Sequence, residues 1–240
     1  MPTQQLNEDA PFVPIGEAVA TLKKPFSDYF TSTPEEAAEH EAWIKSKLAE
    51  KKEHAMDLAR MDWELAVPPE LRVTNFQDAR LTPYAAQIST ILKWKMGKRG
   101  IYAVGQSGRG KSRAMYALAR RLAVTDLVNV RYLLQNEITR DINRDGMTGF
   151  LEKMDQVKRA SVILWDDFGK FAAMGSRKDV LFAEIEALVD YRFSHGLPFL
   201  ISANAKDGDL IQLFGELRGK PIIRRLLEGC EVVNFGWEET

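Results

Sequence analysis

Residues 105–112 match a complete phosphate-binding loop, with the pattern G-x-x-x-x-G-K-[ST]. The loop reads Gly105-Gln106-Ser107-Gly108-Arg109-Gly110-Lys111-Ser112 and lies between a predicted strand, Ile101–Val104, and a predicted helix, Lys111–Ala123. In such loops the backbone N–H groups and the helix N-terminus bind phosphate oxygens. We expect Lys111 to reach the β- and γ-phosphates and Ser112 to bind Mg²⁺. The alternative is a glycine-rich turn with a surface lysine, and the strand and helix argue against it.

Two adjacent aspartates follow another apolar run, Val162–Trp165. A buried strand has no use for two neighbouring charges, whereas a phosphate-binding loop needs a carboxylate on a second strand beside its metal. We therefore expect Asp166 to hold Mg²⁺, directly or through water. Asp167 is then expected to orient or activate the attacking water. Without the loop, a solvated acidic turn would be the better interpretation.

Two further polar features occupy positions suited to sensing a nucleotide. Asn204 follows the apolar run Phe199–Ser202 and could bind the γ-phosphate or the attacking water; a turn-capping role is the alternative. Arg224 and Arg225 lie on a short predicted helix near the C-terminus. Their spacing alone favours a solvated helix face over a phosphate-binding role.

Short β-type runs alternate with helical segments from about residue 100 onward. This pattern predicts an α/β fold with a mostly parallel sheet between helices. The predicted strands are Ile101–Val104, Val128–Leu134, Val162–Trp165, Phe199–Ser202 and Glu231–Phe235, and the predicted helices between them include Lys111–Ala123 and Asp179–Phe193.

The N-terminal quarter differs from the rest of the chain. Residues 1–30 contain four prolines and predict an irregular arm. Thr33-Pro34-Glu35-Glu36 then has the pattern of a capping box and predicts a helix to about Met61, with a narrow apolar stripe on a surface dense in Lys and Glu. Because Pro68-Pro69 interrupts regular structure, we divide the chain into an N-terminal region, 1–66, and a second domain, 67–240.

The composition limits the possible functions. The 240 residues include 33 Lys and Arg against 34 Asp and Glu, so any nucleic-acid contact must come from a local patch. The single cysteine, Cys230, excludes a disulfide framework and a cysteine metal cluster. No apolar run approaches the ~20 residues of a membrane span, and the N-terminus lacks the basic start of a signal peptide. We therefore expect a cytoplasmic protein without a membrane partner.

The order of these motifs resembles DnaC/DnaI-type replicative helicase loaders, which are AAA+ ATPases related to the IstB-like ATP-binding family. The resemblance extends from Val67 to Phe235, and Tyr191-Arg192-Phe193 with Leu197-Pro198 and Asn204 points to this family rather than to P-loop proteins in general. The other segments that carry it are Val67–Phe76, Gly105–Ser112, Leu164–Gly169 and Arg224–Glu228.

The resemblance implies an AAA+ core that uses ATP and Mg²⁺, self-associates through the ATPase domain and binds single-stranded DNA. It also implies that residues 1–66 bind the hexameric replicative helicase. Lys111 and Ser112 match the Walker A pair, Asp166 and Asp167 the Walker B pair, and Asn204 the first sensor. Arg225 matches the arginine offered to a neighbouring subunit's nucleotide. Asp167 departs from the glutamate of many AAA+ proteins, and its shorter side chain is expected to slow hydrolysis.

The interpretation that we favour is an ATPase that loads a helicase during the initiation of DNA replication. An IstB-like transposition helper that binds DNA and recruits a transposase is the main alternative. A small-molecule kinase is disfavoured, because it would leave Asn204 and Arg225 without roles. The DNA-binding residues are the least defined part: the candidates, each interleaved with acids, are Arg140, Arg144, Arg177 and Lys178.

Overall fold

A computed structural model describes residues 33–170 and 178–237, without the side chains of 134–137, 139–145 and 147. The predicted N-terminal arm, 1–30, lies outside the described residues. By their internal contacts, the residues divide into two compact units, 1–52 and 53–240. The assignment of residues 1–66 as a separate functional region therefore stays a prediction.

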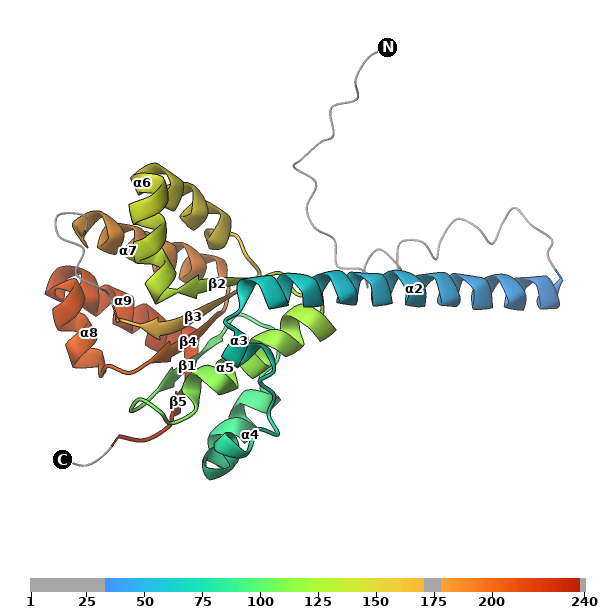
Figure 1. Ribbon diagram of the computed structural model, residues 1–240, viewed down its shortest axis with the longest axis horizontal. Coiled ribbons are helices and arrows are strands. Elements are labelled where there is room, and N and C mark those ends of the chain that lie inside the picture. The colour runs from blue at the N-terminus through green and yellow to red at the C-terminus, as the bar shows by residue number, and fades with distance from the viewer. Residues whose placement is uncertain (1–32, 171–177, 238–240) are drawn as a thin grey trace, which may run out of the picture. The chain divides into compact units, whose positions relative to one another are not determined.

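The second unit is built on a parallel sheet of strand order β2-β3-β4-β1-β5 (Figure 1). The elements in chain order are α2 (Pro34–Ala66), α3 (Pro69–Arg72), a 3₁₀ helix η1 (Ala79–Tyr84), α4 (Ala85–Lys93), β1 (Gly100–Val104), α5 (Lys111–Arg120), a π-helical turn η2 (Arg121–Thr125), β2 (Val130–Leu134), α6 (Gln135–Lys158), β3 (Val162–Phe168), α7 (Lys178–His195), β4 (Phe199–Ala203), α8 (Asp207–Phe214), α9 (Glu216–Gly229) and β5 (Cys230–Asn234). Each predicted strand is confirmed, and every strand pair is parallel.

Helices cover both faces of the sheet, as the apolar runs predicted. Alternate residues of a strand point to opposite faces: Ile101 and Ala103 pack with α4 and α5, whereas Tyr102 packs with α7 and α9. Figure 1 shows α3, α4 and α5 on one side of the sheet and α6 to α9 on the other. Two separate apolar clusters hold the layers together. Because the strands are parallel, the carboxyl ends of β1, β3 and β4 lie at one edge of the sheet.

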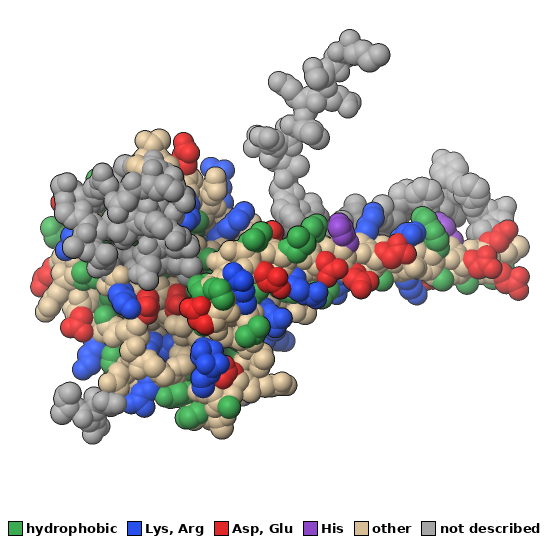
Figure 2. All heavy atoms as spheres, in the orientation of Figure 1, with side chains coloured by type: hydrophobic (Ala, Val, Ile, Leu, Met, Phe, Trp, Pro, Cys, Tyr) green, Lys and Arg blue, Asp and Glu red, His purple; other side chains and the backbone are tan. Residues whose placement is uncertain are grey.

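The capping box predicted at the start of α2 is confirmed. The Thr33 hydroxyl accepts a hydrogen bond from the Glu36 N–H, and the Glu36 carboxylate accepts one from the Thr33 N–H. Side chains of both charges alternate with apolar ones along α2 (Figure 2), and Ile44 and Leu48 are well exposed. Near the end of the helix, Trp63 is buried within the second unit, where its indole N–H donates to the Arg72 carbonyl at 3.0 Å.

The segment before β1 contains two short helices rather than one continuous helix. A 3₁₀ helix contains Pro83, and α4 follows it and ends at Lys93. Pro83 lacks the N–H that a continuous α-helix would use there, which explains the tighter first segment.

Arg192 holds the amino ends of β3 and β4 together. Its side chain is fully buried, and the guanidinium donates to the carbonyls of Ala160 and Pro198, both at 2.7 Å. Longer hydrogen bonds reach the carbonyls of Lys158 and Ser161. Burial lowers the pKa of Arg192 to about 10, so the group remains charged at neutral pH. The Tyr-Arg…Leu-Pro signature thus has a structural role in the sheet.

Among the described residues, no helix has both the length and the apolar character needed to cross a bilayer.

Candidate functional site

The phosphate-binding loop connects β1 to α5, as the sequence predicts. Gly110 adopts φ 87°, a left-handed conformation that glycine reaches without strain. A side chain at Gly105 would meet the Gly236 carbonyl oxygen at 2.9 Å, because the chain after β5 passes directly beside the loop. Backbone hydrogen bonds fix that approach: Phe235 N–H donates to Val104 at 2.8 Å and Gln106 N–H donates to Gly236 at 3.0 Å. The loop is therefore held in shape by β5.

Lys111 lies inside this loop rather than on the surface. Its side chain is buried, and Nζ donates to the Gln106 carbonyl oxygen at 2.6 Å. Burial lowers the pKa of Lys111, while the carboxylates of Asp167 and Asp166 oppose that shift. A buried ammonium facing two carboxylates and a loop of N–H groups is well suited to bind a polyphosphate. The alternative of a surface lysine does not fit this burial.

The two aspartates end β3 with different environments. The register between β3 and β4 shifts between Trp165 and Phe168, and Asp167 takes a left-handed φ of 55°. That conformation costs a non-glycine residue about 1–2 kcal/mol, so it needs compensation. The Asp167 N–H donates to the Ser202 hydroxyl at 3.0 Å, and the Asn204 amide donates to the Asp167 carboxylate at 2.6 Å. The bulge therefore turns Asp167 toward Asn204, which directly follows β4.

Ser202 connects the Asp166 carboxylate to the Asp167 backbone, and the sequence did not indicate this role. Its hydroxyl accepts the Asp167 N–H and donates to the Asp166 carboxylate, and the residue is 1% exposed. The one polar side chain inside the otherwise apolar strand Phe199–Ala203 could have indicated that Ser202 has a functional role. Its partners could not be inferred, because they depend on the register between β3 and β4.

The Asp166 carboxyl has an altered pKa. Burial raises its pKa, and hydrogen bonds from the Ser202 and Ser112 hydroxyls oppose that rise. Asp166 thus meets Ser112 directly, which brings together the two residues predicted to hold a metal. Hydroxyl and carboxylate oxygens are suitable ligands for Mg²⁺, which in such sites keeps several waters and phosphate oxygens as its other ligands. The described residues contain no cluster of three or more His, Cys, Asp or Glu ligands.

A cavity of about 500 Å³ opens over these groups. Asp167, Asn204 and the loop from Ser107 to Ser112 line it. The segment before β1 forms another part of its wall, with the lining residues Leu71, Arg80, Pro83 and Tyr84.

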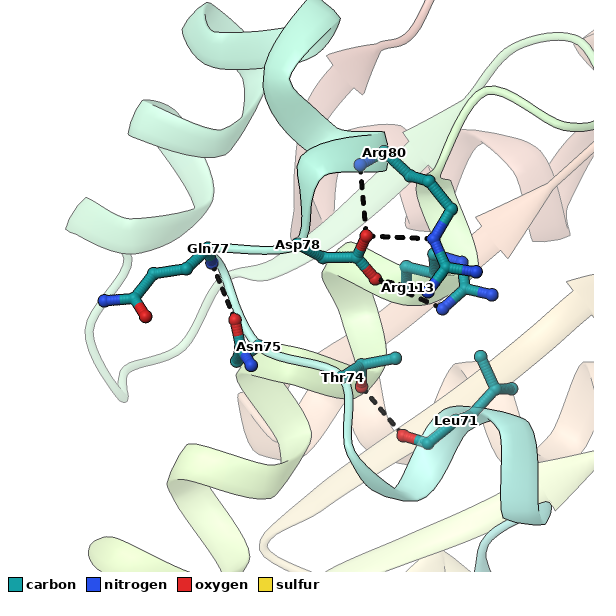
Figure 3. A network of polar contacts seen from close by, with 7 residues as sticks. All are labelled: Leu71, Thr74, Asn75, Gln77, Asp78, Arg80 and Arg113. Carbon is teal, nitrogen blue, oxygen red and sulfur yellow. Dashed lines mark hydrogen bonds and ion pairs between the residues drawn. The ribbon is translucent and has the colours of Figure 1, made fainter.

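That wall is fixed to α5 by a charged network (Figure 3). The Asp78 carboxylate accepts hydrogen bonds from the Arg80 guanidinium at 2.9 Å and from Arg113 at 3.3 Å. Hydrogen bonds from Arg80 lower the pKa of Asp78 to about 2. Because Arg113 directly follows Ser112, the network ties the wall to the phosphate-binding loop.

The remaining candidates lie elsewhere. Arg225 lines a different pocket, and its Nε lies 2.6 Å from the carboxylate of Asp190 on α7, so the structure does not bring it to Lys111 within one chain. Arg224 is well exposed. Of the DNA-binding candidates, Lys178 lies over the Phe182 ring, whereas Arg177 and the side chains of Arg140 and Arg144 fall outside the described part.

The sequence matches no protein-family model and no curated protein. Solved structures do match its fold. The crystal structure of DnaI is 22% identical with a TM-score of 0.53, and the match covers 70% of this chain and 91% of that one. A putative primosome component from Streptococcus pyogenes serotype M3 is 19% identical with a TM-score of 0.52, covering 70% and 89%. The DnaC helicase loader is 14% identical with a TM-score of 0.51, covering 70% and 99%.

The replication initiator DnaA, solved with AMPPCP and single-stranded DNA, is 13% identical with a TM-score of 0.51, covering 70% of this chain and 50% of that one. At these identities the similarity shows the fold. The chain therefore has the AAA+ P-loop fold of DnaC/DnaI-type helicase loaders, as its motifs predicted.

Proposed function

We propose that this protein is an ATPase that loads a replicative DNA helicase onto single-stranded DNA during the initiation of replication. The observation that supports this most is the meeting of Lys111, Asp167 and Asn204 at one cavity, in a fold shared with DnaI and the DnaC helicase loader. A P-loop fold alone serves many functions, so the proposal rests on the site and the fold together.

In the proposed hydrolysis step, Lys111 leaves the Gln106 carbonyl and binds the β- and γ-phosphates of ATP. Ser112 and Asp166 would hold Mg²⁺, which when bound would neutralise charge on the phosphates. Asp167 orients a water and accepts its proton as the water oxygen attacks the γ-phosphorus. The bond to the β-phosphate oxygen breaks, and ADP leaves. Asn204 acts by fixing the Asp167 carboxylate through its 2.6 Å hydrogen bond.

The N-terminal region is proposed to bind the hexameric helicase. The apolar side chains of Ile44, Leu48 and Leu58 on α2 are 37–50% exposed, as expected of a helix that binds another protein through this face. Deleting residues 1–52, the first compact unit, should abolish helicase binding and spare ATP binding, because every residue of the cavity belongs to the second unit. Co-purification of the truncated protein with the helicase would contradict this assignment.

Arg225 is proposed to act on the nucleotide of a neighbouring subunit, because it lies away from its own cavity. A guanidinium supplied by another protomer offsets the charge that builds up during phosphoryl transfer, and is worth about 10³-fold or more in other NTPases. Such a role requires exchange of the Asp190 ion pair for the phosphate.

A mixing experiment tests this role. Arg225→Ala and Lys111→Ala should each lack ATPase activity, but a mixture should regain part of it, since one subunit type supplies Arg225 and the other Lys111. If the variants still assemble and no ratio restores activity, Arg225 serves only its ion pair.

A loading assay tests the proposed function. The purified protein, with its helicase and ATP, should transfer the helicase to circular single-stranded DNA, and Lys111→Ala should not. A protein that hydrolyses ATP without transferring the helicase, and that instead recruits a transposase to duplex DNA, would favour the transposition alternative. A cytoplasmic location is part of the same proposal.

A further inference from the structure

Positive charge is concentrated in one part of the chain. Residues 79–125 contain no Asp or Glu but carry ten Lys and Arg, although acids slightly outnumber bases over the whole sequence. Four of the ten, Arg80, Arg109, Lys111 and Arg113, line the nucleotide cavity and have a role there. The other six are Lys93, Lys95, Lys98, Arg99, Arg120 and Arg121, and the proposed ATPase chemistry does not use them.

These six residues lie at the opposite edge of the sheet from the cavity. Lys93 ends α4, the next three precede β1, and Arg120 and Arg121 lie where α5 passes into η2. The two segments meet directly, since the Arg121 guanidinium donates to the Leu92 carbonyl at 3.3 Å and to the Trp94 carbonyl at 3.2 Å. The amino end of β1 and the carboxyl end of α5 thus form one basic surface, which we call the 93–99 surface.

The backbone of this surface is well anchored. Trp94 is buried in the core, and its indole N–H donates to the Arg99 carbonyl at 2.9 Å, which closes the loop between α4 and β1. Arg99 in turn donates to the Cys230 carbonyl at 2.6 Å. Lys93, Lys95 and Lys98 are therefore displayed from a fixed loop, which lowers the entropy lost when they bind a ligand.

Within the part of the chain that the structure describes, no ion pair or hydrogen bond engages the side chains of Lys93, Lys95, Lys98 or Arg120. Three acids lie around this edge: Asp126 is 4.0 Å from Arg121, Glu228 lines the same hollow as Lys98 and Arg99, and Glu231 on β5 pairs in register with Ile101. Clustered exposed cations repel one another, so this arrangement is favoured when a polyanion lies across it.

We propose that the 93–99 surface binds the phosphate backbone of DNA without reading its sequence. The spacing of several cations along a fixed edge suits a regular row of phosphates. No aromatic side chain among residues 79–125 is exposed, so this segment offers no platform on which unpaired bases could stack. Duplex DNA, with its higher charge density, is therefore expected to bind more tightly than a single strand. This site goes beyond the loading function and does not depend on ATP.

The salt dependence can be estimated from the free cations. If Lys93, Lys95, Lys98 and Arg120 each contact a phosphate, the slope of log K against log salt is about −3.6 for duplex and about −2.8 for single strands. Raising salt from 50 to 200 mM should then weaken duplex binding by about 150-fold and single-strand binding by about 50-fold.

The test is fluorescence anisotropy with labelled duplex and single-stranded oligonucleotides of unrelated sequences, in the absence of nucleotide. The triple variant Lys93→Gln/Lys95→Gln/Lys98→Gln keeps the aliphatic stems and removes three charges. For duplex DNA, the slope of log K against log salt should be shallower than the wild-type slope by about 2.7. At 50 mM salt the affinity of the variant for duplex should be lower by about tenfold or more. The control Lys45→Gln/Lys51→Gln/Lys52→Gln changes the net charge equally on exposed positions of α2 and should bind DNA like the wild type.

The outcomes separate this surface from the loading function. Loss of DNA binding in the triple variant alone, with ATP hydrolysis and helicase binding retained, supports the proposal even if loading itself fails. Equal losses in both triple variants would overturn it, because net charge rather than this surface would then explain binding. Unchanged DNA affinity in the Lys93/Lys95/Lys98 variant also overturns it. If that variant instead loses helicase binding, the surface binds an acidic protein rather than DNA.

Discussion

Replacing Arg192 with methionine tests whether its buried guanidinium stabilises the sheet. The side chain is fully buried and donates 2.7 Å hydrogen bonds to the carbonyls of Ala160 and Pro198. Methionine fills similar space but removes the 2.7 Å donor from both carbonyls, and Pro198 keeps only a 3.4 Å hydrogen bond from the Ile163 N–H. An unsatisfied buried carbonyl costs about 1–3 kcal/mol. Because the desolvation cost of the guanidinium is also removed, we expect a net loss of about 3 kcal/mol, a large share of the roughly 5–15 kcal/mol that stabilises a domain.

Urea unfolding monitored by circular dichroism measures this loss as a shift in the midpoint at unchanged slope. Arg224→Met is the matched control, because Arg224 is well exposed and the change should stay within about 0.5 kcal/mol. Arg192→Lys should recover only part of the loss, since one ammonium cannot span the two strands. A loss below about 1 kcal/mol for Arg192→Met would refute the structural role.

The remaining predictions concern the cavity. Asp167→Asn should keep ATP affinity near that of the wild type and lower turnover by about 10²-fold or more, because an amide is a poor base; wild-type turnover in a steady-state ATPase assay would remove this assignment. Ser202→Ala should lower turnover and also stability by about 1–3 kcal/mol, since it orphans the Asp167 N–H; an unchanged urea midpoint and turnover would show that Ser202 positions nothing. Because its pKa is raised, Asp166 becomes protonated at higher pH than an ordinary aspartate. Mg²⁺-dependent ATP binding, measured by calorimetry, should therefore weaken as pH falls through that pKa. The Asp166→Asn variant should not show this weakening at low pH. The pKa of Asp78 is lowered to about 2, so its ionised form stabilises the fold at pH values above the unfolded pKa near 3.8, and this stability is lost as pH falls toward 2. Asp78→Asn should therefore lower the free energy of unfolding by about 1–2 kcal/mol at pH 7 and by less near pH 3. A difference that does not change with pH would contradict the ion-pair account.

The loop from Gly105 to Ser112 could be predicted because its chemistry is local. Glycines, lysine and serine at fixed spacing imply both the backbone shape and the ligand. The position of Asp166 could also be inferred, since the carboxyl ends of parallel strands share an edge. Strand positions were predicted well for the same reason: each apolar run is short and bounded by helix signals.

Ser202, Asp78 and Arg192 could not be assigned from the sequence. Ser202 and Arg192 act through partners on other elements, and Asp78 also bonds Arg113 on α5 besides its neighbour Arg80. Such partners depend on register and packing rather than on spacing. Asp167 illustrates the limit: its position was predicted, but the left-handed φ of 55° that turns it toward Asn204 arises from a bulge that no local pattern indicates.

Affinity purification of the tagged full-length protein from its native host tests the central claim most directly. The proposed function predicts a replicative helicase as the main partner identified by mass spectrometry, recovered with the wild type and with Asp167→Asn but not after deletion of residues 1–52. Recovery of a transposase instead of a helicase would contradict the claim, and so would a helicase that the deleted protein still retains.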